Sequence, residues 1–352
     1  QYHLDRQLVA ASNYARAKHI VLKGDIPIGI HRASADAWVE PELYNMDGQA
    51  GAPPDPFSAT GQNWGFPTYR WDVMAQDNYQ WWRNRFTQLA RYFDAFRIDH
   101  ILGFFRIWQI PLHAVVGTLG FFNPAIPIDR AEFDERGMWF DRDRLCRPYV
   151  REHLLRRYFG ERTDFVKDTF LKYQGHGVYQ FQEALSTQRQ VQQWITEHPE
   201  YQELEAGLFD LLGNVLFIEH EGSDGKQFHP RIELQKTSSF QELDAATQAD
   251  INALYHNYFY ERQEDFWREQ AMTKLPALKA ATNMLICGED LGMVPAVVPG
   301  VMTELEILTL EIQRMSKKTT TEFLQGADIP YLSVASPGTH DMDPLRLWWE
   351  DL

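Results

Sequence analysis

Three acidic residues, Asp99, Glu289 and Asp341, each follow an apolar segment with the pattern of a buried strand. An ionised carboxylate can act as a nucleophile, and a partly desolvated carboxyl with a raised pKa can donate a proton. A third acid can stabilise positive charge that develops during the reaction. Three carboxylates, each behind its own strand and in the order Asp, Glu, Asp, favour a catalytic site over chance placement.

Asp99 has a basic neighbour on its own strand. Residues two apart on a strand point to the same side, so Arg97 and Asp99 project together. The opposite charge lowers the pKa of a carboxyl, and we therefore expect Asp99 to be ionised. A purely structural Arg–Asp ion pair explains the same pattern equally well.

The other two acids also have ordinary alternatives. We expect Glu289 to be partly desolvated, with a raised pKa that suits a general acid. The adjacent Asp290 has the alternative role of a helix N-cap. Asp341 is equally explained as a turn residue, whereas His340 beside it offers a hydrogen-bond donor to a substrate hydroxyl.

Alternating helices and strands must position these residues. Helices are predicted over 4–18, 77–93 and 343–352, and strands over 19–30, 93–99, 283–288, 305–312 and 331–335. Functional residues at the carboxyl ends of alternating strands predict an α/β fold of the (β/α)8 TIM-barrel type. A long loop over 31–75, rich in Gly, Pro and Asp, is typical of a functional loop.

The spacing of the acids predicts an insertion in this barrel. One βα unit takes about 30 residues, far fewer than separate Asp99 from Glu289. We therefore expect residues 1–116 to form the first segment of the barrel, 117–260 an inserted, mainly helical subdomain, and 261–352 the second segment of the barrel.

Composition excludes several classes of function. The net charge of −15, from 34 basic and 49 acidic residues, disfavours a nucleic-acid partner. No apolar run is long enough to span a bilayer and no secretory signal is recognisable, so we expect no membrane partner and a cytoplasmic location. Cys146 and Cys287 lack metal-ligand spacing, and we expect neither metal nor other cofactor.

Five motifs resemble, in order, those of the amylomaltases, the 4-α-glucanotransferases of glycoside hydrolase family 77. They cover residues 24–28, 57–67, 96–100, 288–292 and 339–341. The stretches 65–69 and 100–108 look closest to the maltose-using disproportionating subgroup of plant cytosol and its bacterial relatives, which also carries an insertion between nucleophile and acid. The resemblance implies that the barrel is incomplete, with strands before Gln1 and beyond Leu352.

The resemblance also implies roles for single residues. Asp99 resembles the nucleophile, Glu289 the general acid/base and Asp341 the transition-state stabiliser. Positions that resemble the substrate-binding residues of the family are Arg97, His340, Asp25, Trp64 and His100. The implied activity is retaining transfer of glucosyl or short α-1,4-glucan units from maltose or maltooligosaccharides to glucans such as glycogen or starch.

Two positions depart from the family's pattern. Pro56 stands where the family usually has Tyr, and Met342 where it often has Asn. Two other functions remain open: an α-amylase-type hydrolase that uses the same carboxylates with water as acceptor, and a catalytically incompetent glucan-binding fragment. The sequence gives no indication of the oligomeric state. Trp64 and Trp108 could act as aromatic platforms for the acceptor in the cleft, although core packing is the more ordinary role for Trp108.

Overall fold

The computed structural model describes residues 1–55, 58–317 and 321–351. The chain divides into two compact units, each assembled from segments distant in the sequence. The first unit comprises residues 1–44, 69–106 and 264–352, and the second comprises residues 45–68 and 107–263. The departure from the family pattern at Pro56 lies outside the described residues.

The first unit alternates helices and strands. Its helices are α1 (Tyr2–Ala17), α2 (Ala35–Val39), α3 (Trp71–Met74), α4 (Gln80–Leu89), α13 (Glu264–Lys279), α14 (Val298–Glu304) and α15 (Leu345–Glu350). Its strands are β1 (Lys23–Ile26), β6 (Ala95–Ile98), β15 (Leu285–Gly288), β16 (Thr309–Ile312) and β17 (Ser333–Ser336). The short pair β2 (Tyr44–Asn45) and β5 (Thr68–Tyr69) lies at the boundary of the units.

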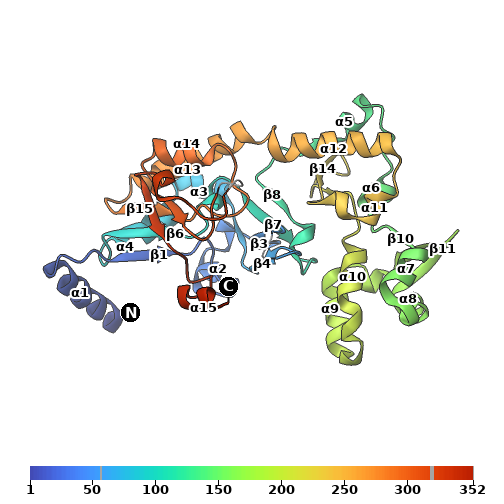
Figure 1. Cartoon of the computed structure of the whole chain (residues 1–352), viewed down its shortest axis with the longest axis horizontal. Coiled ribbons are helices and arrows are strands. Elements are labelled where there is room, and N and C mark those ends of the chain that lie inside the picture. The colour runs from blue at the N-terminus through green and yellow to red at the C-terminus, as the bar shows by residue number, and fades with distance from the viewer. Residues whose placement is uncertain (56–57, 318–320, 352) are drawn as a thin grey trace. The chain divides into compact units, whose positions relative to one another are not determined.

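These five strands run parallel. β6 lies between β1 and β15, with Arg97 in register with Asp25 on one side and Cys287 on the other. Parallel bridging of Cys287 to Leu308 continues the order to β16, which pairs in parallel with β17. Because the five strands share one direction, their carboxyl ends lie at one edge, where α/β proteins bind their ligands. Figure 1 shows β1, β6 and β15 of this unit close together.

An aromatic core supports the middle strand. Trp82 and Phe86 on α4 contact each other at a ring-centroid distance of 5.9 Å, and Phe86 lies 4.9 Å from Phe96 on β6. Phe104 completes the cluster at 5.2 Å from Trp82. All four side chains are fully buried, and each contributes about 1.5–3 kcal/mol or more by leaving water. The core thus fixes the chain on both sides of residue 99.

The predicted alternation of helices and strands is confirmed, and the fold is α/β. The expected helix over 4–18 is α1, and the expected strand over 283–288 is β15. The strand expected over 19–30 is shorter than predicted, since β1 covers only Lys23–Ile26. Pro27 follows directly, and a residue without an N–H cannot continue a ladder.

The second unit combines helices with short antiparallel strands. Its helices are α5 (Arg130–Glu135), α6 (Arg142–Cys146), α7 (Glu152–Phe159), α8 (Thr163–Phe170), α9 (Gln188–Glu197), α10 (Glu205–Leu212), α11 (Ser238–Gln241) and α12 (Ala245–Tyr260). Its strands are β3 (Gly48–Ala52), β4 (Gln62–Asn63), β7 (Ile107–Pro111), β8 (Phe121–Asn123), β9 (Ile128–Asp129), β10 (Val150–Arg151), β11 (Leu171–Gly175), β12 (Val178–Phe181), β13 (Phe217–Glu219) and β14 (Gln227–Pro230).

Its strands form three sheets, in the orders β4-β3-β7-β8, β13-β14-β9 and β10-β12-β11. Helices α7 to α10 share one buried apolar cluster that includes Leu155, Val166, Val191 and Leu208. The expected division of the chain at residues 116 and 260 stays a prediction.

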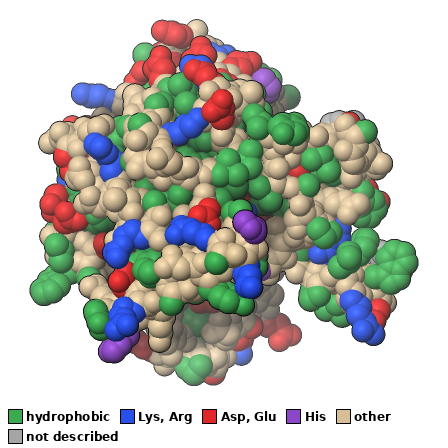
Figure 2. All heavy atoms as spheres, turned by 90° about the vertical axis from the view of Figure 1, so that its left-hand side faces the viewer, with side chains coloured by type: hydrophobic (Ala, Val, Ile, Leu, Met, Phe, Trp, Pro, Cys, Tyr) green, Lys and Arg blue, Asp and Glu red, His purple; other side chains and the backbone are tan. Residues whose placement is uncertain are grey.

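The helices and one face of the surface can be compared with the composition. In the described part of the chain, no helix is long and apolar enough to cross a membrane. On the face drawn in Figure 2, acidic and basic side chains are interspersed with apolar ones. The net charge of −15 is therefore not gathered into one patch on that face.

Candidate active site

Two of the three acids emerge from neighbouring strands at the same level. The N–H of Asp99 donates to the carbonyl of Ile26 at 2.9 Å, and the N–H of Glu289 donates to the carbonyl of Ile98 at 2.9 Å. Since Ile98 is in register with Gly288, Asp99 and Glu289 are the next opposed pair. The parallel sheet itself therefore places these two residues side by side.

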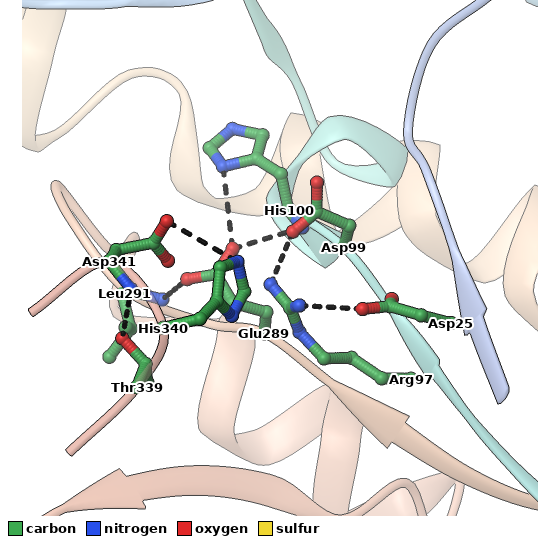
Figure 3. A network of polar contacts seen from close by, with 9 residues as sticks. All are labelled: Asp25, Arg97, Asp99, His100, Glu289, Leu291, Thr339, His340 and Asp341. Atoms are coloured by element: carbon green, nitrogen blue, oxygen red, sulfur yellow. Dashed lines mark hydrogen bonds and ion pairs between the residues drawn. The ribbon is translucent and has the colours of Figure 1, made fainter. Parts of the chain in front are cut away.

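Arg97 joins two acidic side chains. Its guanidinium donates to Asp25 at 2.8 Å and to Asp99, as Figure 3 shows. The side chain of Arg97 is only 16% exposed, so this cation is largely shielded from water. The sequence-based expectation that Arg97 and Asp99 project together is confirmed by their hydrogen bond.

Arg97 lowers the pKa of Asp99 as expected, but a larger opposing effect was not expected. Burial raises the pKa of the Asp99 carboxyl above its ordinary value, and Arg97 only partly offsets this rise. The negative charges of Asp25 and Asp341 raise the same pKa further. The sequence showed the cation on the strand, but it did not show how much of the carboxyl would leave water.

The side chain of Glu289 is less exposed than that of Asp99. Its Oε2 accepts the backbone N–H of His100 at 2.9 Å and its Oε1 accepts that of Leu291 at 2.9 Å. Burial, assisted by the charge of Asp99, nevertheless raises the pKa of Glu289 to about 7. A carboxyl with this pKa holds its proton near neutral pH and can release it to a substrate.

His100 turns the chain sharply between β6 and the following 3-10 turn, Ile101–Phe104. Its backbone is left-handed, with φ 45° and ψ 58°, a region that His tolerates better than most residues. This turn directs two successive amides at residue 289, because the N–H of Ile101 donates to the Glu289 carbonyl at 3.0 Å. Burial lowers the pKa of the His100 ring to about 3, so the ring is neutral.

Asp341 and His340 lie in the loop after β17. Both side chains are 72% exposed, and His340 Nε2 lies 3.3 Å from Asp341 Oδ1. In Figure 3 the loop faces Glu289. Both residues act electrostatically on the Asp99 carboxyl, since Asp341 raises its pKa and His340 lowers it. The first unit thus brings together Asp25, Arg97, Asp99, His100, Glu289, His340 and Asp341.

Trp64 belongs to the second unit. Its ring stacks on Phe66 at 5.7 Å and 22°. The expectation that Trp108 is a core residue is confirmed, because it is buried and its Nε1 donates to the carbonyl of Gly117 at 2.9 Å. Met342, at the second departure from the family pattern, donates its N–H to the carbonyl of Thr339 at 3.2 Å.

The arrangement places two carboxyls in different environments. Asp99 is partly exposed beside a guanidinium, whereas Glu289 is largely buried and its pKa is raised to about 7. A partly exposed carboxyl next to a largely buried one with a raised pKa is a pair suited to nucleophilic and acid roles on one bond. Among the residues described, no group of three or more His, Cys, Asp or Glu side chains is placed to hold a metal ion.

Comparison with known families decides the class of protein. Residues 1–352 match the family described as 4-alpha-glucanotransferase, so the match extends along the chain. The chain belongs to the 4-alpha-glucanotransferase family.

Named members of the 4-alpha-glucanotransferase family match over different lengths. The rice (Oryza sativa subsp. japonica) 4-alpha-glucanotransferase DPE2 is 44% identical over 361 residues, which cover 100% of this chain and 38% of the rice protein. The Chlamydia caviae 4-alpha-glucanotransferase is 40% identical over 108 residues, covering 31% of this chain and 20% of that protein. Each match covers well under half the length of the relative, 38% of the rice protein and 20% of the Chlamydia protein.

A solved structure supports the fold of this 4-alpha-glucanotransferase family member. The amylomaltase from Corynebacterium glutamicum aligns with a TM-score of 0.51 and 16% identity, covering 99% of this chain and 30% of that chain. The amylomaltase from Streptococcus agalactiae, solved in complex with acarbose, aligns with a TM-score of 0.50 and 18% identity, covering 100% and 44%. At these identities the likeness concerns the fold alone.

Sequence reasoning missed one ionic cluster behind the site. The carboxylate of Asp290 accepts the N–H of Leu310 at 3.0 Å and pairs with Lys317 at 2.7 Å. Lys317 also pairs with Glu311 at 2.9 Å, which ties the loop after β15 to β16. Asp290 therefore anchors the loop of Glu289 instead of capping a helix, a role that short-range spacing cannot reveal.

Proposed function

We propose that this chain is the catalytic core of a retaining 4-α-glucanotransferase. It transfers glucosyl or short α-1,4-glucan units from maltose or maltooligosaccharides to glucans such as glycogen or starch. The observation that carries the proposal is the register of Asp99 beside Glu289, which combines a guanidinium-bound carboxyl with one whose pKa is raised to about 7. We also propose a cytoplasmic location.

The strand register supports a retaining mechanism. Neighbouring strands lie about 4.8 Å apart, and Asp99 and Glu289 follow opposed residues of two such strands. Retaining glycosidases hold their two carboxyls about 5–5.5 Å apart, whereas inverting ones leave about 6.5–9.5 Å for a water. Opposed positions on adjacent strands suit the shorter spacing.

In the proposed first step, Glu289 protonates the glycosidic oxygen while Asp99 attacks the anomeric carbon. The bond to the leaving sugar breaks, and a covalent glycosyl ester forms on Asp99. Glu289, now a carboxylate, then takes the proton from the 4-hydroxyl of an acceptor glucan. That hydroxyl oxygen attacks the anomeric carbon and releases Asp99, so the anomeric configuration is retained.

The surrounding residues have supporting roles in this proposal. Arg97 limits the rise in the pKa of Asp99 and binds the sugar at the cleaved bond. Asp341 stabilises the oxocarbenium-like transition state, and His340 donates to a sugar hydroxyl. Asp25, Trp64 and His100 are proposed to line the glucan-binding cleft.

We further propose that the parallel strands β1, β6, β15, β16 and β17 are part of a (β/α)8 barrel. Their common direction and the helices between them support this architecture. The site residues then lie at the carboxyl edge, where the active sites of such barrels are found.

Incubation of the purified chain with maltose and glycogen tests the proposed activity. Transfer releases glucose and lengthens glycogen while the number of glycosidic bonds, and hence of total reducing ends, stays constant. Hydrolysis increases the total reducing ends. We expect glucose release with constant reducing ends, and loss of release in Asp99→Asn. Glucose release accompanied by a rise in total reducing ends, or no release by the folded chain, would overturn the proposal.

A further inference from the structure

One arginine bridges both ends of the loop that carries His340 and Asp341. Arg314 follows β16, and its Nε donates to the carbonyl of Pro337 at 2.9 Å. Its Nη2 donates to the carbonyl of Asp343 at 2.8 Å. The two acceptors bracket residues 337–343, which we call the carboxylate loop.

The middle of the carboxylate loop has weaker internal contacts. The N–H of Asp341 donates to Thr339 Oγ1 at 3.3 Å, and that of Met342 to the Thr339 carbonyl at 3.2 Å. Near the start of the loop, Ser336 Oγ donates to the Gly338 carbonyl at 2.6 Å. The start of the loop is thus held by both Arg314 and Ser336, whereas its far end is held by the 2.8 Å bond from Arg314 Nη2 to the Asp343 carbonyl.

The space around Gly338 shows how closely the guanidinium is fitted. A Cβ added to Gly338 would overlap Arg314 Nη2 and lie 3.1 Å from Cζ and 3.3 Å from Nε. These three nearest atoms all belong to Arg314. The guanidinium carbon also lies 5.2 Å from the ring centroid of Trp348 on α15, in a cation–π contact. The loop backbone and an aromatic ring therefore both contact this one side chain.

We propose that Arg314 is a positioning residue that holds the carboxylate loop so that His340 and Asp341 face the catalytic carboxyls. The inference rests on the proposed function, in which these two residues act on the sugar. A planar guanidinium can donate to two carbonyls at once, whereas the ammonium of lysine is a point donor on a flexible stem. The glycine at 338 leaves the room that this arrangement requires.

Hydrogen–deuterium exchange of the carboxylate loop tests the hold directly. In Arg314→Ala we expect exchange of peptides covering 337–343 to become several-fold faster, with a smaller effect in Arg314→Lys. Arg346→Ala is the matched control, because Arg346 lies on α15, is 90% exposed and pairs with Glu350 one turn further along the same helix at 2.8 Å. Loop exchange that stays at the control level in Arg314→Ala would overturn the proposal.

A double-mutant cycle identifies the contact responsible. Gly338→Ala should speed exchange on its own, because its Cβ displaces the guanidinium from both carbonyls. In the Arg314→Ala background the same change should have little further effect, since the atoms it would meet are gone. A merely structural glycine would instead give independent, additive effects, and additivity would refute the proposed contact.

Transfer kinetics separate this inference from the proposed function. If the wild-type chain transfers, Arg314→Ala should lower kcat about 10- to 100-fold, because small misplacements of catalytic groups have effects of that size. Faster loop exchange with unchanged kcat would refute the positioning role. If the wild-type chain shows no transfer, the proposed function fails, while the exchange cycle still decides whether Arg314 holds the loop.

Discussion

Replacement of Arg97 by methionine removes the cation beside Asp99 and keeps a side chain of similar length. In the structure Arg97 pairs with both Asp25 and Asp99 and is largely buried. The pKa of Asp99 is already raised by burial, and Arg97 is the main influence that lowers it. Without Arg97 that pKa must rise further, so Asp99, the proposed nucleophile, is protonated over a wider range of acidic pH.

The size of this shift follows from distance and exposure. An opposite charge in contact shifts a carboxyl pKa by about 1–3 units. Asp99 is 42% exposed, so solvent screening favours the low end of that range. We therefore expect the acidic limb of kcat/KM to move upward by about one pH unit in Arg97→Met. At a pH below the acidic limbs of both the wild-type chain and Arg97→Met, this shift corresponds to an about tenfold loss of kcat/KM.

The assay is the pH dependence of initial glucose release from maltose with glycogen as acceptor. Arg97→Lys keeps the charge and should leave the acidic limb close to its wild-type position. Asp25→Asn removes a negative charge that raises the pKa of Asp99, so its acidic limb should move to lower pH. The alkaline limb should respond more weakly in Arg97→Met, because Arg97 is the smallest of the influences on Glu289.

Arg97→Met and Asp25→Asn are expected to move the acidic limb in opposite directions. An acidic limb that stays in place or moves to lower pH in folded Arg97→Met would show that Arg97 does not control the ionisation of Asp99. Equal shifts in Arg97→Lys and Arg97→Met would show that lost hydrogen bonds, and not lost charge, cause the effect.

Three further expectations concern the acid, a buried lysine and a packed glycine. Glu289→Gln should lower kcat by about 10²–10⁴ and abolish the alkaline limb near pH 7, measured in the same assay. Burial lowers the pKa of Lys274 to about 7, so above that pH the unfolded state binds more protons than the folded state. The thermal stability of the wild-type chain should therefore rise between about pH 7 and 10.5, and Lys274→Met should remove this rise. Gly288→Ala places a Cβ 2.8 Å from Ile101 and should cost about 1–3 kcal/mol in urea unfolding, whereas Gly300→Ala in open space on α14 should stabilise by about 0.5–1 kcal/mol.

Local patterns predicted the elements that carry the site. Apolar runs before Asp99 and Glu289 are the strands β6 and β15, and the spacing of Arg97 and Asp99 placed them on one side of a strand. The expected rise in the pKa of Glu289 also agrees with its burial. These features depend on periodicity and on contacts between near neighbours, which a sequence displays directly.

Local sequence patterns could not predict contacts between segments that are distant in the sequence. Arg314 donates to the backbone carbonyls of Pro337 and Asp343. Because every residue has a backbone carbonyl, the residue types at 337 and 343 do not indicate this contact. The sequence also did not predict the turn at His100, because the hydrogen bond from its N–H to the Glu289 carboxyl depends on the pairing of the two strands. The net rise in the pKa of Asp99 depends on burial by the whole fold.

The central claim, that Asp99 is the nucleophile of a retaining transfer, is tested most directly by trapping the glycosyl-enzyme. Incubation with a 5-fluoroglycosyl fluoride, followed by proteolysis and mass spectrometry, locates the ester bond. We expect one glycosyl adduct on the peptide that contains Asp99, and no adduct in Asp99→Asn. An adduct on another residue, or consumption of the reagent by the wild-type chain without any adduct, would contradict the assignment.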